Sequence, residues 1–93
     1  MYSNKYILEK IEEFNHHNPI YDWMEGRIAY PAYFCIGERG WFLVIEDGLC
    51  KELAHRIHTS IIQSTTYIRD ENTINTIIVT TENTRFTFKL KKD

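Results

Sequence analysis

Cysteine is scarce in this chain, and the two that occur match no familiar cysteine site. Cys35 and Cys50 form neither the C-x-x-C pair of redox proteins nor the paired knuckles of a zinc site. Thiols in a reducing cytosol normally stay free, and a free cysteine behaves as a small buried hydrophobic residue. We therefore expect two structural thiols.

Glycine and long apolar runs are also scarce. With four glycines and neither G-x-G-x-x-G nor G-K-[ST], no phosphate-binding loop can be read. The longest nearly uncharged run, residues 28–37, contains Pro31 and is far shorter than the roughly 20 apolar residues of a membrane-spanning helix. The first ten residues lack the pattern of a secretory signal. These absences predict a cytoplasmic protein without a membrane span.

A strong excess of either charge is missing as well. The formal net charge is −2, with −4 on residues 1–50 and +2 on residues 51–93. This is too weak a basic excess to predict non-specific nucleic-acid binding. The composition, 43% hydrophobic and 26% charged, is that of a soluble globular protein, and 93 residues allow a single domain, residues 1–93.

The N-terminal segment shows apolar spacing typical of a helix. Ser3 can cap a helix over residues 4–16, and Ile7, Leu8, Ile11 and Phe14 follow at helical intervals. Pro19 disfavours helical backbone at the residue before it, so we expect the helix to end there.

The rest of the chain is typical of strands. An irregular aromatic segment leads into a strand at residues 32–37, and the turn at residues 37–40 leads into the apolar run "WFLVIE", which we expect to be buried on both faces of a hairpin. Asp47 and the spacing of Leu49, Leu53 and Ile57 predict a short second helix over residues 49–57, although a strand starting near His55 also fits. The segments "IIQSTTYIR", "TINTIIVTT" and "RFTFKL", joined by turn-length links, predict an antiparallel meander.

Together these elements predict an α+β domain in which an N-terminal helix packs on a five-stranded antiparallel sheet. The same element order occurs in Sm-like and SH3-like small barrels, which is a barrel-like alternative. The expected core contains Ile7, Leu8, Ile11, Phe14, Phe42, Val44, Ile78, Phe86 and Phe88.

The stretch "HRIHTSIIQS" raises the question of chemistry. His55 and His58 share a face only if the segment is helical, and even then a metal site needs a further ligand that is not evident. The residues from His58 also fit the H-x-[ST]-apolar element of two-histidine phosphoesterases, but the second copy that such enzymes need is absent. Thr59 and Ser60 lack a base at readable spacing. We therefore expect no enzyme, no cofactor and no metal, and keep a histidine-dependent phosphoesterase or metal-site protein as a second alternative.

The run "RIHTSIIQS…TIIVTTENTRFTF" resembles the C-terminal part of small uncharacterised proteins of phages and bacterial mobile elements. Its marks are an "HTS" strand start and a strand ending in "T-x-N-T" before an aromatic-bearing strand, over about the last forty residues. The resemblance implies a β-meander and no reaction. The phage context implies a small inhibitor that binds a host nucleic-acid-handling protein, of the anti-CRISPR kind.

Aromatic residues suggest how such a module would bind. They make up 14% of the chain and crowd into the irregular segment, and Tyr, Trp and Arg often dominate the binding energy of protein interfaces. We therefore expect a protein-binding module, pairing as a homodimer through an open sheet. The predicted partner-binding residues are Tyr21, Trp23, Arg27, Tyr30 and Tyr33.

The charge near the predicted binding residues indicates what kind of protein surface they would suit, and nucleic-acid binding is an alternative to protein binding. Asp22 and Glu25 would suit a partner with a basic surface. The first alternative is a small barrel that binds RNA or single-stranded DNA. It would use Arg56, Tyr67, Arg69, Arg85, Lys89 and Lys91.

Overall fold

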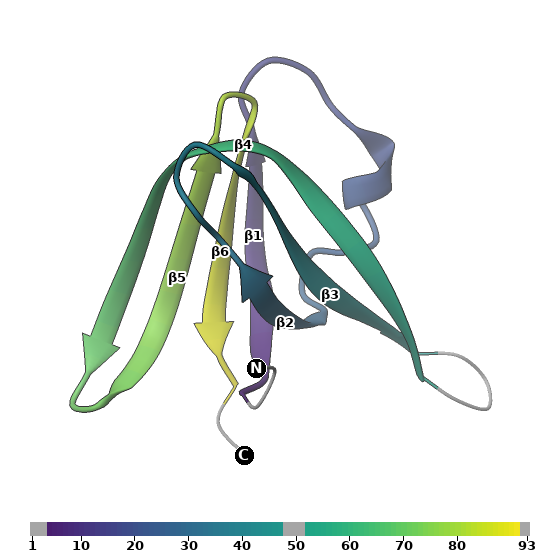
Figure 1. The fold of residues 1–93 in the computed structure, drawn as a ribbon. Coiled ribbons are helices and arrows are strands. Elements are labelled where there is room, and N and C mark those ends of the chain that lie inside the picture. Colours follow the sequence, from purple (N-terminus) through teal and green to yellow (C-terminus); the bar gives the residue numbers. More distant parts are fainter. Residues whose placement is uncertain (1–3, 48–51, 92–93) are drawn as a thin grey trace.

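In the residues that the structure describes, the chain folds as a closed antiparallel β-barrel of six strands in sequential order, and the predicted α+β class is wrong. The computed structural model describes residues 4–47 and 52–91. The described strands pair in the order β1-β2-β3-β4-β5-β6, and β6 returns to β1 (Figure 1). Their bounds are β1 Tyr6–Glu13, β2 Ile28–Tyr33, β3 Arg39–Asp47, β4 Glu52–Asp70, β5 Thr73–Thr81 and β6 Thr84–Leu90. The structure shares a closed sheet with the barrel-like alternative, but it has the strand β1 where that alternative had a helix.

The long strand β4 gives the barrel its shape. The first half of β4, as far as Ile61, pairs with β3, and the second half, from Ile62 to Asp70, pairs with β5. In Figure 1 this strand arches across the barrel, so that the β3–β4 hairpin and the β4–β5 hairpin form two arms on opposite sides. Register irregularities fall near the arch, between Arg39 and Trp41 and between Ile62 and Ser64.

The predicted N-terminal helix is a strand. Tyr6 and Leu8 alternate inward and are buried, and β1 pairs with β6 along its length, with Leu8 opposite Phe88. A strand fits this sequence because its backbone groups find partners on β6, and an irregularity between Leu8 and Lys10 lets Ile11 also pack against the core. The proposed cap, Ser3, lies outside the described residues.

The second helix is also wrong for its described part. Residues 52–57 belong to β4, so the segment is a strand as in the alternative, but it begins at Glu52 rather than near His55; residues 49–51 lie outside the described residues. The first hairpin strand lies at Ile28–Tyr33, a few residues before the predicted 32–37. The three-stranded C-terminal meander is confirmed.

The core is aromatic and lies between the two halves of the barrel. Phe42 packs edge-on against Phe86 and Phe88, with ring centroids 5.3 and 5.1 Å away, and all three side chains are buried. Of the predicted core residues, Leu8 and Val44 are also buried, and Ile11 packs against the core. The predictions for Phe14, Ile7 and Ile78 are wrong: Phe14 is exposed, while Ile7 and Ile78 are only half-buried.

The segment between β1 and β2 closes one side of the barrel. It contains a single turn of 3₁₀ helix, Pro19–Tyr21, whose preceding residue Asn18 accepts a hydrogen bond from the Ile20 N–H. Met24, farther along, is fully buried in the core. In the part of the chain that the structure describes, no helix has the length and apolar character needed to cross a membrane.

Candidate functional site

The outward side of the β2–β3–β4 arm carries a continuous set of aromatic and aliphatic side chains. Ala29 and Val44 face the core, so the residues that alternate with them face outward. Two cross-strand rows result, one of Tyr33, Trp41 and His58 and one of Tyr30, Leu43 and Arg56. We call these six residues the outer aromatic face.

An arginine and a tryptophan from neighbouring strands are in contact on this face. The Arg56 guanidinium lies over the Trp41 ring, 4.2 Å from its centroid. This contact joins the two rows diagonally, because Trp41 is opposite His58 while Arg56 is opposite Leu43. A cation above an indole is an attractive arrangement that also holds the ring in one orientation.

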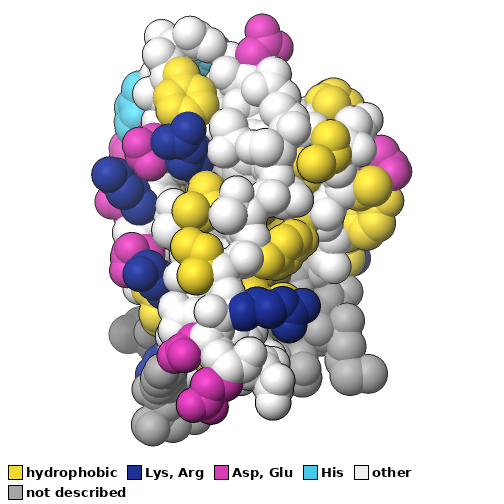
Figure 2. All heavy atoms as spheres, turned by 90° about the vertical axis from the view of Figure 1, so that its left-hand side faces the viewer, with side chains coloured by type: hydrophobic (Ala, Val, Ile, Leu, Met, Phe, Trp, Pro, Cys, Tyr) yellow, Lys and Arg dark blue, Asp and Glu magenta, His cyan; other side chains and the backbone are white. Residues whose placement is uncertain are grey.

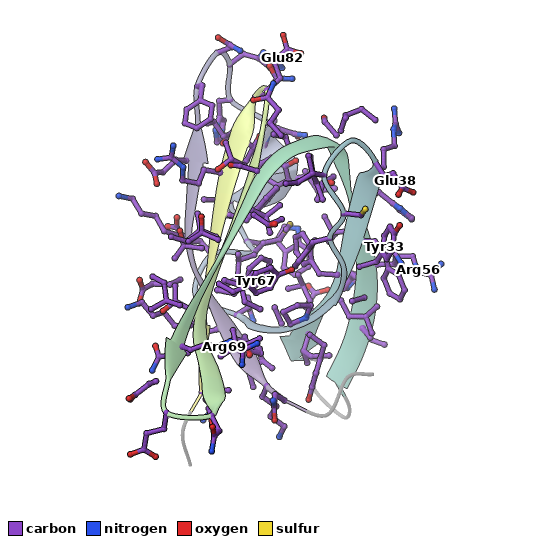
Figure 3. The ribbon with its side chains drawn as sticks, turned by 60° about the vertical axis from the view of Figure 1, so that its left-hand side comes forward. Tyr33, Glu38, Arg56, Tyr67, Arg69 and Glu82 are labelled. Atoms are coloured by element: carbon purple, nitrogen blue, oxygen red, sulfur yellow. The ribbon has the colours of Figure 1, made fainter. Side chains whose placement is uncertain are left out.

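Tyr33 is held at the border of the face by a carboxylate. Its hydroxyl donates a hydrogen bond of 3.0 Å to Glu38 Oε2, and both residues lie on the same side of the barrel as Arg56 in Figure 3. The Glu38 hydrogen bond, followed by the influence of Cys35, raises the pKa of Tyr33 to about 12. The phenol is protonated at physiological pH even at its ordinary pKa of about 10, so the ring on this border is neutral and half-exposed.

The five residues predicted to bind a partner do not form one surface. Tyr21 turns inward and packs edge-on against Phe86, with centroids 5.6 Å apart, and Trp23 packs against His55 at 5.0 Å. The Arg27 Nε donates a hydrogen bond of 3.0 Å to the Trp23 carbonyl oxygen. Only Tyr30 and Tyr33 of this set lie on the outer aromatic face.

The sequence contained a signal for the residues that the prediction missed. The run "WFLVIE" was expected to be buried on both faces, whereas Phe42 and Val44 point inward and Trp41 and Leu43 point outward. Strict alternation across a strand would have placed these two residues together with Tyr30.

The acidic residues of the predicted surface are engaged elsewhere: Glu25 accepts a hydrogen bond from the Ile11 N–H, and Asp22 contacts His17.

The residues of the nucleic-acid alternative are spread over three parts of the molecule. Arg56 lies on the outer aromatic face, whereas Tyr67 and Arg69 lie on the second half of β4, in the opposite arm (Figure 3). Lys89 and Arg85 lie on β6, and Lys91 follows that strand. Arg85 is held between the Phe14 ring, 5.4 Å from its guanidinium, the Thr80 hydroxyl and the Glu12 carboxylate. These cations do not follow one track.

His17 and His55 contact carboxylates in separate places. His55 and His58 point to opposite faces of β4, and His55 Nε2 lies 2.7 Å from Glu46 Oε2. His17 bridges Glu13 and Asp22, with a ring nitrogen 2.9 Å from an oxygen of each. Across residues 4–47 and 52–91, no three His, Cys, Asp or Glu side chains are grouped so that they could hold a metal ion.

Thr59 of the "HTS" stretch has a structural position. It is buried, its Oγ1 accepts a hydrogen bond of 2.8 Å from the Gly40 N–H, and it donates one of 2.7 Å to the Ser60 carbonyl oxygen. Its hydroxyl is thereby used twice within the fold. These two hydrogen bonds give Thr59 a structural role that requires no catalytic one.

Comparison of the chain with protein-family models, with curated proteins and with solved structures found no match. The resemblance to phage and mobile-element proteins therefore stays a prediction, and the outer aromatic face is the feature of the molecule that points to a function.

Proposed function

We propose that this chain is a small non-enzymatic binding module that recognises another protein through its outer aromatic face. The observation that carries the proposal is the Arg56–Trp41 contact on a half-exposed surface that also carries Tyr30, Leu43 and Tyr33. Large rigid rings and arginine supply most of the binding energy at protein interfaces, because they bury much area and lose little conformational freedom.

The sheet beneath the face supports the same proposal. Every residue of the face lies on a strand paired with a neighbour, so its backbone is already held in place before a partner binds. A preorganised surface loses less conformational entropy on binding than a loop does. The finer proposal, from the phage resemblance, is that the partner is a host nucleic-acid-handling protein and that binding inhibits it.

A single-stranded nucleic acid is the second candidate, because barrels that bind it also combine aromatic rings with arginine. The surroundings of the face favour a protein. Glu38 lies beside Tyr33, and the other cations considered for this role lie on other parts of the molecule. A nucleic-acid site needs a basic groove that follows the phosphates, and this mixed surface does not offer one.

The chain itself offers a matched pair of variants for the test. Tyr33→Thr with Arg56→Thr changes the face, and Phe14→Thr with Arg85→Thr removes another ring and arginine that are in contact, away from the face, where Phe14 is about equally exposed, 46% against 44% for Tyr33. Threonine suits a strand, so both double variants should remain folded. Circular dichroism and thermal unfolding check this before any binding experiment.

Each immobilised variant is then exposed to a nuclease-treated lysate of the organism that encodes the chain. We expect a protein partner to be recovered by wild type and by the Phe14, Arg85 control, and to be lost with the Tyr33, Arg56 variant. Equal recovery by all three would show that the face is not the binding surface.

Fluorescence anisotropy with labelled single-stranded DNA and RNA tests the second candidate. Micromolar affinity at physiological salt, falling steeply as the salt concentration rises, would replace our proposal with nucleic-acid binding.

A further inference from the structure

The second half of β4 has one edge without a strand beside it. Pairing of β4 with β3 ends at Ile61. The next residue, Ile62, bonds to the turn before β3. The Ile62 N–H donates to the Glu38 carbonyl oxygen at 2.9 Å, and the Ile62 carbonyl oxygen accepts a hydrogen bond of 2.8 Å from the Gly37 N–H. Beyond that point β4 pairs with β5 on one side only, within the part of the chain that the structure describes. We call residues 63–70 the edge segment.

The edge segment lacks the features that normally prevent strands from pairing. Its sequence is QSTTYIRD, so it has no proline and no lysine, and its first six residues are uncharged. Threonine, tyrosine and isoleucine favour strands, and Tyr67 and Ile68 are 45% and 48% exposed. Edges of natural sheets are usually blocked by charge, proline, bulges or covering segments. The irregularities in the pairing with β5 fall beside Gln63 and beside Arg69, which leaves residues 64–68 as a regular ladder.

We propose that two copies of this chain pair through their edge segments as antiparallel strands related by a two-fold axis. Along an edge strand, the N–H and C=O groups of every second residue point to the open edge. In an antiparallel pair, such a residue lies opposite a residue whose N–H and C=O groups also point toward the partner strand. A symmetric pair must therefore place one residue opposite its own copy. The centre of the edge segment offers Thr66, Tyr67 or Ile68 for this position.

Charge repulsion does not oppose a second copy in any of these three registers. Arg69 and Asp70 are the only charged residues of the edge segment, and they lie at one end. The two-fold axis places the charged end of each copy at opposite ends of the paired strands. With Tyr67 on the axis, for example, Arg69 faces Thr65 and Asp70 faces Ser64, so no like charges meet.

The pairing would cover apolar surface without using the outer aromatic face. Tyr67 is opposite Ile77, a core residue of β5, and the side of the molecule that carries β4 and β5 shows apolar side chains in its middle and most charges toward one margin and the lower end (Figure 2). The two arms lie on opposite sides of the barrel (Figure 1), so a dimer joined through one arm would present two outer aromatic faces. The proposal does not depend on what those faces bind.

The test is the mass of the protein in solution, measured by sedimentation and by light scattering after gel filtration. We expect wild type to have twice the 11.1 kDa mass of one chain and Ile68→Lys to have the mass of one chain, because a lysine on each copy would place two charges near the axis. The matched control is Ile61→Lys, which changes a residue of the same strand with similar exposure, 51%, where β4 still pairs with β3. This control should stay dimeric.

Amide hydrogen exchange of the wild-type protein gives a second readout that needs no variant. Pairing protects alternate amides of residues 63–70, and the protection falls on dilution. Wild type that is monomeric over the whole concentration range would overturn the proposal, and so would assemblies that grow beyond two copies. A dimer that persists in Ile68→Lys, or one without concentration-dependent protection of the edge segment, would place the interface elsewhere and overturn it equally.

Discussion

The backbone N–H of Gly40 donates a hydrogen bond of 2.8 Å to Thr59 Oγ1 in the buried region where β3 meets the arch of β4. A β-carbon added to Gly40 would lie 2.5 Å from the Tyr33 carbonyl oxygen, which is closer than such atoms approach in real proteins. This close approach joins β2, β3 and β4 at one point. The "HTS" stretch therefore contributes to stability where the long strand bends.

Replacing Thr59 by valine, which has nearly the same shape, should lower the free energy of unfolding by about 1–3 kcal/mol, because the buried Gly40 N–H loses its acceptor. Urea or guanidinium unfolding measures the change. Ser60→Ala is the control, since Ser60 is exposed and its change should stay within about 0.5 kcal/mol. A Thr59→Val protein as stable as wild type would show that the hydrogen bond has no structural importance.

Phe88→Ala should lower the free energy of unfolding by about 3–5 kcal/mol, because it leaves a cavity beside Phe42 and Phe34. Phe14→Ala removes the same ring from an exposed position beside Arg85, so we expect it to cost about 1 kcal/mol or less. The same unfolding experiment compares the two. Equal losses would contradict the burial described for β1 and β6.

Met24→Ala should lower the free energy of unfolding by about 2–5 kcal/mol, although Met24 lies outside all six strands. The physical reason is its complete burial beneath the segment that joins β1 to β2. Ile20→Ala, in the same segment but half-exposed, is the control and should have a much smaller effect. A small effect of both changes would mean that this segment does not close the core.

The pH dependence of folding should show the contacts of His17. Its hydrogen bond to Asp22, followed by that to Glu13, raises the pKa of His17 above its ordinary value of 6.5. Because the folded-state pKa is raised, the stabilisation is fully present below pH 6.5 and is lost as the pH rises through the folded-state pKa. NMR titration of the His17 ring measures this pKa, and Asp22→Asn should lower it. Titration of His17 at or below 6.5 in wild type would show that the two carboxylates do not hold the ring in solution.

The sequence by itself identified the C-terminal half of the fold. Phe86 and Phe88 alternate with polar residues, and the turn-length links to the preceding strands predict a meander whichever way the rest of the chain folds. The pairings involved are between consecutive strands. Local pattern and final structure agree there because the hydrogen-bond partners lie close in sequence.

Only the tertiary structure decided the state of residues 6–13 and 52–57. Ile7, Leu8, Ile11 and Phe14 satisfy a helical spacing, yet burial of Tyr6 and Leu8 with pairing to β6 makes the segment a strand. The partner of β1 lies more than seventy residues away, so no window along the chain contains it. β4 likewise became one long strand because β3 and β5 supply its hydrogen bonds in turn.

The candidate site divides in the same way. Tyr30 and Tyr33 could be proposed for a surface from their types and crowding, but Trp41, Leu43 and Arg56 could not be assigned to it without knowing which side of β3 faces the core. An apolar run such as "WFLVIE" fits a strand covered on both faces as well as one covered on a single face. The difference depends on whether another layer packs outside it, and that is decided by distant parts of the chain rather than by the run itself.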